Sequence, residues 1–250
     1  PMNRIGIVNQ KGGGGKTTTA INLASYLVRA GQRVLLVDLD PQANATSGLN
    51  QQPTDDGIYS LLLGESSPEQ SVREIGPGFH LLPAGADLVG ANAELTHRPH
   101  RLREVLESLS PAYDLILIDA PPSLGPLTLN ALVASEGLRV PVQAEYYALE
   151  GIAGLMETVD EVRGSLNPAL RLLGVLITMF DSRTLLSQQV ESNIRSHLGE
   201  KVFWTVIPRN VRLAEAPSHG QAIGDYAPTS SGAHAYRRLA EEVMRRVQEA

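Results

Sequence analysis

The stretch Lys11-Gly12-Gly13-Gly14-Gly15-Lys16-Thr17-Thr18-Thr19 decides the fold of this 250-residue chain. It follows a short apolar run, Arg4 to Asn9, and precedes a helical pattern, Thr17 to Ala30, which Gly31 ends. A glycine loop between a strand and a helix lets backbone N–H groups converge on phosphate oxygens, with the positive end of the helix dipole behind them. The sequence therefore predicts a phosphate-binding loop in a βαβ unit.

Two side chains of this loop carry the expected chemistry. Lys16 would neutralise the β- and γ-phosphates of a nucleotide, and the hydroxyl of Thr17 would bind Mg²⁺. The strict phosphate-loop pattern fails because residue 10 is glutamine rather than glycine. Lys11 adds an ammonium group beyond what one phosphate group requires, so it either serves a neighbour or is a solvated loop lysine. The nucleotide-binding residues expected in the loop itself are Gly12, Gly13, Gly14, Gly15, Lys16, Thr17 and Thr18.

Short apolar runs alternate with amphipathic helical segments along the whole chain, which is typical of a parallel sheet covered by helices on both faces. We therefore expect an α/β fold of the P-loop NTPase type, with a doubly wound, mostly parallel sheet. No linker or internal repeat divides residues 1–250, so one domain is expected. The expected strands are Arg4–Asn9, Arg33–Asp38, His80–Pro83, Asp114–Asp119, Gly137–Gln143, Leu172–Met179 and Val202–Ile207, and a terminal helix is expected over Ala233–Ala250.

The composition excludes several kinds of functional site and of membrane segment. The chain has no cysteine, which rules out disulfides, thiolate metal sites and a cysteine nucleophile. Its 21 Lys and Arg against 27 Asp and Glu give a net charge of −6, so any contact with nucleic acid must be local. No apolar run is long enough to span a membrane, and the mixed charges of Ala233–Ala250 argue against a membrane-surface helix. A cytoplasmic protein without a membrane partner is expected.

Two of the expected strands end in aspartates, where open parallel sheets hold their ligands. The run Val34-Leu-Leu-Val-Asp38 continues into Leu39-Asp40-Pro41-Gln42, and Asp114-Leu-Ile-Leu-Ile-Asp119 continues into Ala120-Pro121-Pro122. Asp38 would reach the Mg²⁺ shell through water, and Asp119 would hold a magnesium-bound water in the manner of a Walker B carboxylate. Asp40 would orient the attacking water of a phosphoryl transfer or, alternatively, cap its loop.

The loop resembles that of the deviant Walker A ATPases, the MinD/ParA superfamily, whose pattern is K-G-G-x-G-K-[ST]-T. The family usually has valine where this chain has Gly14. Two further blocks, Val37-Asp-Leu-Asp-Pro-Gln-Ala-Asn-Ala-Thr46 and Ile207-Pro-Arg-Asn-Val-Arg-Leu-Ala-Glu-Ala-Pro-Ser-His-Gly220, make the chain similar to the ParA/Soj chromosome and plasmid partitioning ATPases. The resemblance covers essentially the whole chain.

This resemblance implies an ATPase that hydrolyses ATP to ADP with Mg²⁺ and forms a homodimer with ATP between its subunits. Such a dimer binds double-stranded DNA without sequence preference, lies on the nucleoid and is stimulated by a ParB-type centromere-binding protein. Lys11 would then reach the phosphates of the partner subunit and act in catalysis with Lys16 and Asp40. The resemblance also places Met179, Pro208 and Asn210 around the adenine, and it marks Arg183 and Arg212 as DNA-binding residues.

Simpler alternatives stay open for the arginines. Asp181 would balance Arg183, and Glu215 would pair with Arg212. The basic stretch His97–Arg103 is a secondary candidate for DNA contact. Two other functions fit the same fold: a MinD-like ATPase positioned on a membrane, and a biosynthetic enzyme that activates a carboxylic acid with ATP. DNA binding that depends on the nucleotide would distinguish partitioning from both.

Overall fold

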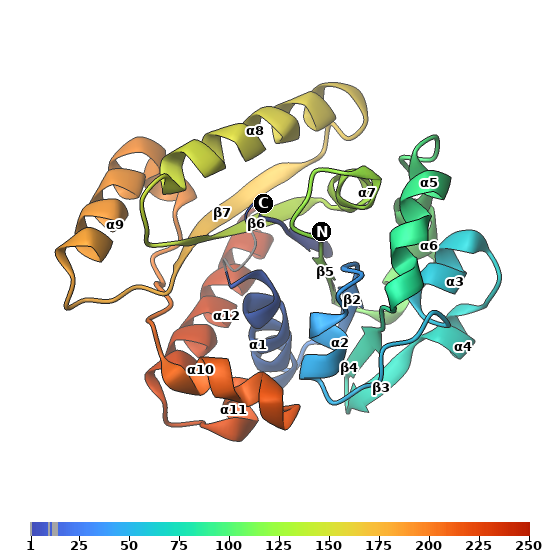
Figure 1. Cartoon of the computed structure of the whole chain (residues 1–250), viewed down its shortest axis with the longest axis horizontal. Helices are drawn as coiled ribbons and strands as arrows, with labels where there is room; N and C mark the ends of the chain where they lie inside the picture. Colours follow the sequence, from blue (N-terminus) through green and yellow to red (C-terminus); the bar gives the residue numbers. More distant parts are fainter. Residues whose placement is uncertain (1, 10, 12–14) are drawn as a thin grey trace.

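The computed structural model describes residues 2–9, 11 and 15–250 (Figure 1). Its centre is one seven-stranded sheet in the order β3-β4-β2-β5-β1-β6-β7. All neighbouring strands run parallel except β3 and β4, which are antiparallel. This sheet confirms the expected α/β fold. The strands are β1 (Arg4–Ile7), β2 (Val34–Asp38), β3 (Arg73–Gly76), β4 (Phe79–Leu82), β5 (Leu115–Asp119), β6 (Gly137–Gln143) and β7 (Arg171–Thr178).

Helices cover both faces of the sheet (Figure 1). One face packs against α1 (Lys16–Arg29), α2 (Asn44–Gly48), α10 (Val211–Glu215), α11 (Ile223–Tyr226) and α12 (Ser231–Glu249). The other packs against α3 (Ile58–Leu63), α5 (Ala91–Leu95), α6 (Arg101–Leu109), α7 (Pro126–Ala134), α8 (Ala148–Ser165) and α9 (Leu185–Leu198). The short α4 (Pro68–Ser71) and the 3₁₀ turns Ala86–Gly90, Ser110–Ala112, Gly199–Lys201 and Ala216–His219 complete the described elements.

The central strands are buried on both faces, which is why they read as continuous apolar runs. In β2, Leu35 and Val37 belong to the core under α3 to α9, whereas Val34 and Leu36 belong to the core under α1 and α12. Successive side chains of a strand point to opposite faces, so one apolar run fills two cores. Each of these four side chains has no exposed surface.

The first helix shows how the glycine loop sets the chain onto the sheet. Gly15 has the left-handed backbone φ of 79°, and α1 begins at the next residue, Lys16. Ala20, Leu23 and Leu27 then recur on the face that packs on the sheet. Gly31, with φ of 90°, follows the end of the helix in a conformation that costs little without a β-carbon.

Two sequence-based predictions of strands were wrong. The antiparallel edge strand β3 was not expected, and residues 202–207 form no strand but only an isolated bridge, Val175 to Val202. In that segment the N–H groups of Trp204 and Thr205 donate to Glu242 of α12, at 2.8 and 3.0 Å. The N–H groups of Phe203 and Ile207 still donate to the carbonyls of Val175 and Ile177 in β7, each at 2.9 Å, so the Glu242 carboxylate interrupts the ladder between them.

The helices show no membrane-crossing segment. Over residues 2–9, 11 and 15–250, none of them combines the length and the apolar character that a crossing requires.

Candidate active site

The carboxyl ends of three adjacent strands, β2, β5 and β1, bring the expected site residues together. Asp38 ends β2 and Asp119 ends β5, and the two are direct neighbours in the register of the sheet. Ile7, the last residue of β1, is the neighbour of Asp119 on the other side. The loop that follows β1 therefore lies beside two aspartates that are 81 residues apart in sequence, as the register places Asp38 opposite Asp119.

Lys16 and Asp119 form the centre of this site. Lys16 Nζ lies 2.5 Å from Asp119 Oδ1, and only 9% of the lysine side chain and none of the aspartate side chain is exposed. Burial raises the pKa of Asp119 above its ordinary value, while the ammonium of Lys16 opposes that rise. A buried carboxylate is costly without a partner, so this ion pair keeps the end of β5 folded.

Thr17 completes the pairing of Asp119. Its Oγ1 donates a hydrogen bond to Asp119 Oδ2 at 2.9 Å. The two motif residues at the start of α1 thus occupy both oxygens of the aspartate. The set of a lysine, a hydroxyl and a carboxylate fits a magnesium–phosphate group, in which Mg²⁺ takes one or two protein oxygens and completes its shell with phosphate and water.

Asp38 is fully buried, like its neighbour Asp119. Its Oδ2 accepts hydrogen bonds from the backbone N–H and the hydroxyl of Thr46, at 2.9 and 2.7 Å, and its Oδ1 accepts from the N–H of Asp40 at 3.2 Å. Burial, and after it the negative charge of Asp119, raises the pKa of Asp38 to about 7. Asp38 thus anchors the loop after β2. Thr46 is a site residue that the sequence did not single out, although it ends the block Val37–Thr46.

Asp40 lies on the rim of the same group. It is 6% exposed, its Oδ1 accepts from the N–H of Gln42 at 3.0 Å, and its Oδ2 lies 3.9 Å from Lys16 Nζ. Asp40 therefore both caps its loop and lies beside Lys16. One oxygen holds the loop while the other faces the site.

A cavity of about 310 Å³ opens beside the start of α1. It is lined by residues near the start of the chain and by residues from its last third. Met179 has a left-handed φ of 51°, which turns the chain directly after β7. Tyr236 of α12, which the sequence did not single out, also lines the cavity and is hydrogen-bonded at 3.1 Å to Thr19. The expected nucleotide-binding residues among its lining are Gly15, Thr18, Met179, Pro208 and Asn210.

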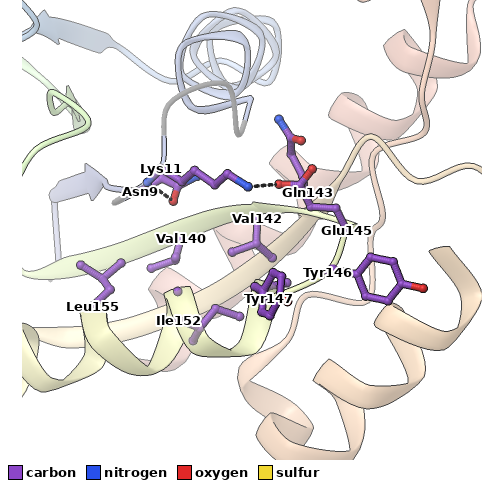
Figure 2. A pocket seen from close by; sticks show the side chains of 12 residues that line it. Asn9, Lys11, Val140, Val142, Gln143, Glu145, Tyr146, Tyr147, Ile152 and Leu155 are labelled. Atoms are coloured by element: carbon purple, nitrogen blue, oxygen red, sulfur yellow. Dashed lines mark hydrogen bonds and ion pairs between the residues drawn. The ribbon is translucent and has the colours of Figure 1, made fainter. Parts of the chain in front are cut away.

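Lys11 pairs with Glu145, outside the Lys16–Asp119 group. Its Nζ lies 2.5 Å from Glu145 Oε1, and Figure 2 shows the side chain reaching along the pocket to this glutamate, which follows β6. The lysine side chain is 73% exposed. Asn9 fixes the backbone there by accepting from the N–H of Lys11 at 3.1 Å. Glu145 is a partner that no motif indicated, because 134 residues separate it from Lys11.

Three expected residues, Gly12, Gly13 and Gly14, lie outside the described residues. Arg183 and Arg212 belong to the described residues, and both side chains are exposed. Arg183 forms an ion pair with Asp181 and Arg212 one with Glu215, each at 3.0 Å. The simpler pairings that the sequence suggested are therefore present, on arginines that remain open to solvent.

No group of three or more His, Asp and Glu side chains in the described residues is arranged to hold a metal ion without help. A nucleotide-bound Mg²⁺ does not require such a group, because its phosphates supply part of the coordination. Thr17 and Asp119 lie together, and Asp38 is beside them, so the donors fit a metal shared with phosphate.

Comparison with known proteins supports the same interpretation. The family described as AAA domain matches residues 2–172. The chain is 68% identical over 249 residues to the chromosome-partitioning ATPase Soj of Thermus thermophilus, covering 100% of this chain and 98% of that protein. It is 47% identical over 254 residues to the chromosome partitioning protein ParA of Caulobacter vibrioides, covering 98% and 95%.

A solved structure shares the fold. The cobyrinic acid a,c-diamide synthase of Mycobacterium smegmatis, crystallised with ADP and magnesium, superposes with a TM-score of 0.86 and 36% identity, covering 99% of this chain and 96% of that one. The two higher identities, each over nearly the whole of both chains, decide the family. This chain belongs to the Soj/ParA family of chromosome-partitioning ATPases.

Proposed function

We propose that this chain is a DNA-partitioning ATPase that works as a nucleotide-dependent homodimer on the nucleoid, one domain spanning residues 1–250. The observation that carries the proposal is the convergence of Lys16 and Thr17 on the buried Asp119, beside a cavity of about 310 Å³. The 68% identity to Soj of Thermus thermophilus gives the biological context.

The side chains divide the chemistry of ATP hydrolysis. Lys16 neutralises the β- and γ-phosphates, and Thr17, Asp119 and Asp38 hold the metal shell. Bound Mg²⁺ supplies further neutralisation of phosphate charge. Asp40 orients the attacking water through its Oδ2, the oxygen that faces Lys16. Phosphoryl transfer depends mainly on positioning and charge neutralisation, so this small set of groups suffices.

The base of the nucleotide occupies the cavity lined by Met179, Pro208 and Asn210. Its volume of about 310 Å³ lies within the ordinary range of small-molecule sites. Gly15 and Thr18 line the same cavity on the side of the loop, so phosphates and base would be contiguous. The loop residues Gly12, Gly13 and Gly14 contribute backbone donors in this proposal.

Dimerisation uses Lys11, whose side chain is exposed. Lys16 serves the nucleotide of its own subunit. In the proposed dimer Lys11 reaches the phosphates held by the partner subunit. The resulting dimer presents Arg183 and Arg212 twice, which doubles the number of phosphate contacts on DNA. ATP therefore switches DNA binding on by selecting the dimer, and hydrolysis, stimulated by a ParB-type protein, switches it off.

The test is binding of a random-sequence duplex, followed by anisotropy, with ADP and with a slowly hydrolysed ATP analogue, at low and high salt. We expect binding only with the ATP analogue and weakening with salt. ATPase turnover with and without Mg²⁺ is measured on the same preparation.

The experiment also distinguishes the two alternatives. Turnover with liposome binding and no DNA binding would favour a membrane-positioned ATPase. Turnover that needs an added carboxylic acid, again without DNA binding, would favour a biosynthetic enzyme such as the one whose fold this chain shares.

A further inference from the structure

Two segments that follow the sheet lie side by side and form one exposed surface. The N–H of Phe180 donates to the carbonyl of Ile207 at 3.0 Å, and the N–H of Arg209 donates to the carbonyl of Phe180 at 2.9 Å. This pairing joins the turn after β7 to the segment before α10. The joined segments carry three exposed arginines, Arg183, Arg209 and Arg212, here called the arginine surface.

The charge of Arg183 is already matched. Its Nε and Nη2 donate to the two oxygens of Asp181, each at 3.0 Å, while 85% of its side chain is exposed. The hydrogen bond from Arg183 lowers the pKa of Asp181, so that carboxylate is ionised at neutral pH. A phosphate that approaches Arg183 therefore meets a bidentate ion pair rather than an isolated cation.

Arg212 is matched in the same way. Its Nη1 lies 3.0 Å from Glu215 Oε2, and the hydroxyl of Tyr226 donates to the same oxygen at 2.7 Å. These two hydrogen bonds, that of Tyr226 before that of Arg212, lower the pKa of Glu215. The carboxylate stays ionised and cancels the charge of Arg212.

Arg209 differs from both. Across the described residues its side chain makes no hydrogen bond or ion pair, although its positive charge contributes to the lowered pKa of Asp181. Three arginines against two ionised carboxylates leave one net positive charge on the surface, and that charge resides on Arg209. A phosphate contact there displaces water alone, without breaking an existing pair.

The backbone of Arg209 is also fixed in place. Its N–H is bonded to Phe180, and its neighbours Pro208 and Asn210 line the nucleotide cavity. Asn210 is anchored at the start of α10, where its Oδ1 accepts from the N–H of Arg212 at 2.8 Å. The arginine is thus presented from a rigid strip between the nucleotide cavity and solvent.

From this geometry we infer that Arg209 is the principal DNA-phosphate contact of the arginine surface, ahead of Arg183 and Arg212. The inference rests on the proposed DNA-binding function. It predicts that one unpaired arginine per subunit carries a larger share of the salt-dependent affinity than the two paired ones.

The test measures the affinity for a random-sequence duplex at several salt concentrations, with Mg²⁺ and a slowly hydrolysed ATP analogue. We compare the wild type with Arg209→Gln, Arg209→Lys, Arg183→Gln and Arg245→Gln. Arg245 is an exposed arginine near the end of α12, whereas it is Ser231, at the start of that helix, that contacts Asn210, so Arg245→Gln is a charge-matched control. Nucleotide affinity is measured for every variant because Arg209 lines the cavity.

Each phosphate contact contributes roughly 0.9 to the slope of log K against log salt. Losing one contact from each subunit of a dimer should lower the slope by roughly 1.8 and the affinity by roughly tenfold or more at moderate salt. Arg209→Gln should show this loss, while Arg209→Lys and Arg245→Gln should keep the slope of the wild type. Arg183→Gln should lower the slope less than Arg209→Gln.

Four results would overturn the inference. An unchanged slope in Arg209→Gln, with the wild type binding DNA, would refute the contact but leave the proposed function standing. An equal loss in Arg245→Gln would show that net charge, not location, sets the affinity. A weaker affinity with an unchanged slope and weaker nucleotide binding would assign Arg209 to the nucleotide site alone. Absence of DNA binding by the wild type with any nucleotide would refute the proposed function and, with it, this contact.

Discussion

Lys16 Nζ and Asp119 Oδ1 are 2.5 Å apart in a pair that solvent scarcely reaches. Lys16 starts α1 and Asp119 ends β5, so the ion pair joins the helix of the phosphate loop to the middle of the sheet. A bound phosphate would take the place of the Asp119 carboxylate beside Lys16, and Mg²⁺ would take the place of the Lys16 ammonium beside Asp119. Each residue would then keep a partner of opposite charge. In the proposed site the same two residues would therefore serve both stability and nucleotide binding.

Lys16→Ala should abolish ATP binding and lower the free energy of unfolding by about 3 kcal/mol, because it leaves the Asp119 carboxylate buried without its cation. Nucleotide binding is measured by calorimetry and stability by urea unfolding. Lys201→Ala, which removes an exposed lysine, is the control and should change neither quantity. Tight ATP binding by the Lys16 variant would sink the assignment of the phosphate site.

Asp40→Ala should bind ATP but hydrolyse it about 100-fold more slowly or worse, since it removes the carboxylate oxygen that faces Lys16. The variant should then accumulate as an ATP-bound dimer, which sedimentation detects. Asp56→Ala, at an exposed aspartate of a distant loop, should behave as the wild type. A monomeric Asp40 variant with normal turnover would rule out this role.

Asp38 predicts a pH dependence of stability for the protein without nucleotide and metal. Burial and the charge of Asp119 raise the pKa of Asp38 from 3.8 to about 7. Between about pH 4 and about pH 7 the folded state therefore holds a proton that the unfolded state has released. The contribution of Asp38 to stability is full below about pH 4 and is lost as the pH rises through about 7. Because Asp38 and Asp119 interact, the proton belongs to the pair.

Asp38→Asn should remove this slope. The melting temperature of the wild type should fall relative to that of the variant between pH 5 and about pH 7.5. Thr46→Val, which takes a hydroxyl hydrogen bond from Asp38 while leaving the carboxyl group, should keep the slope and is the matched comparison. Parallel melting curves of wild type and Asp38→Asn would contradict the raised pKa.

Glu145→Gln should strengthen dimerisation with the ATP analogue, because it releases Lys11 from its ion pair within the chain. The pair is exposed, and exposed ion pairs contribute about 1 kcal/mol at most, so the dimer constant should rise no more than about fivefold. Lys11→Ala should abolish the dimer, and Glu150→Gln, an exposed glutamate of α8, should leave it unchanged. A weaker dimer in Glu145→Gln would mean that the glutamate acts within the interface instead.

Glu242→Ala should lower the free energy of unfolding by about 3 kcal/mol or more. The carboxylate accepts from the N–H groups of Trp204 and Thr205 and from Arg246, and it is 3% exposed. The change would leave the buried N–H of Thr205 and the half-buried N–H of Trp204 without their acceptor. Urea unfolding, followed by the fluorescence of the single tryptophan, measures the loss, and Glu241→Ala on the exposed side of α12 is the control. Equal stability of the two variants would exclude this role.

The strands at the centre of the sheet could be predicted because they are buried on both faces. Leu35 and Leu36 must both be apolar, since they fill opposite cores, and the run ends where Asp38 meets polar surroundings. The edges were harder to predict. Residues 202–207 have the composition of a strand, but the N–H groups of Trp204 and Thr205 donate to Glu242, which lies 38 residues away from Trp204.

The sequence by itself determined the fold class, the phosphate loop and the aspartates at the strand ends, because these follow from local periodicity and from spacing within a few residues. Only the tertiary structure decided that Lys16 pairs with Asp119 and Lys11 with Glu145, and that Arg209 has no such partner among the described residues. An ion pair forms between atoms a few ångströms apart, and the packing of the whole sheet sets those distances. The sequence therefore shows where the charged residues stand along the chain, but not which of them remain unpaired in the folded protein.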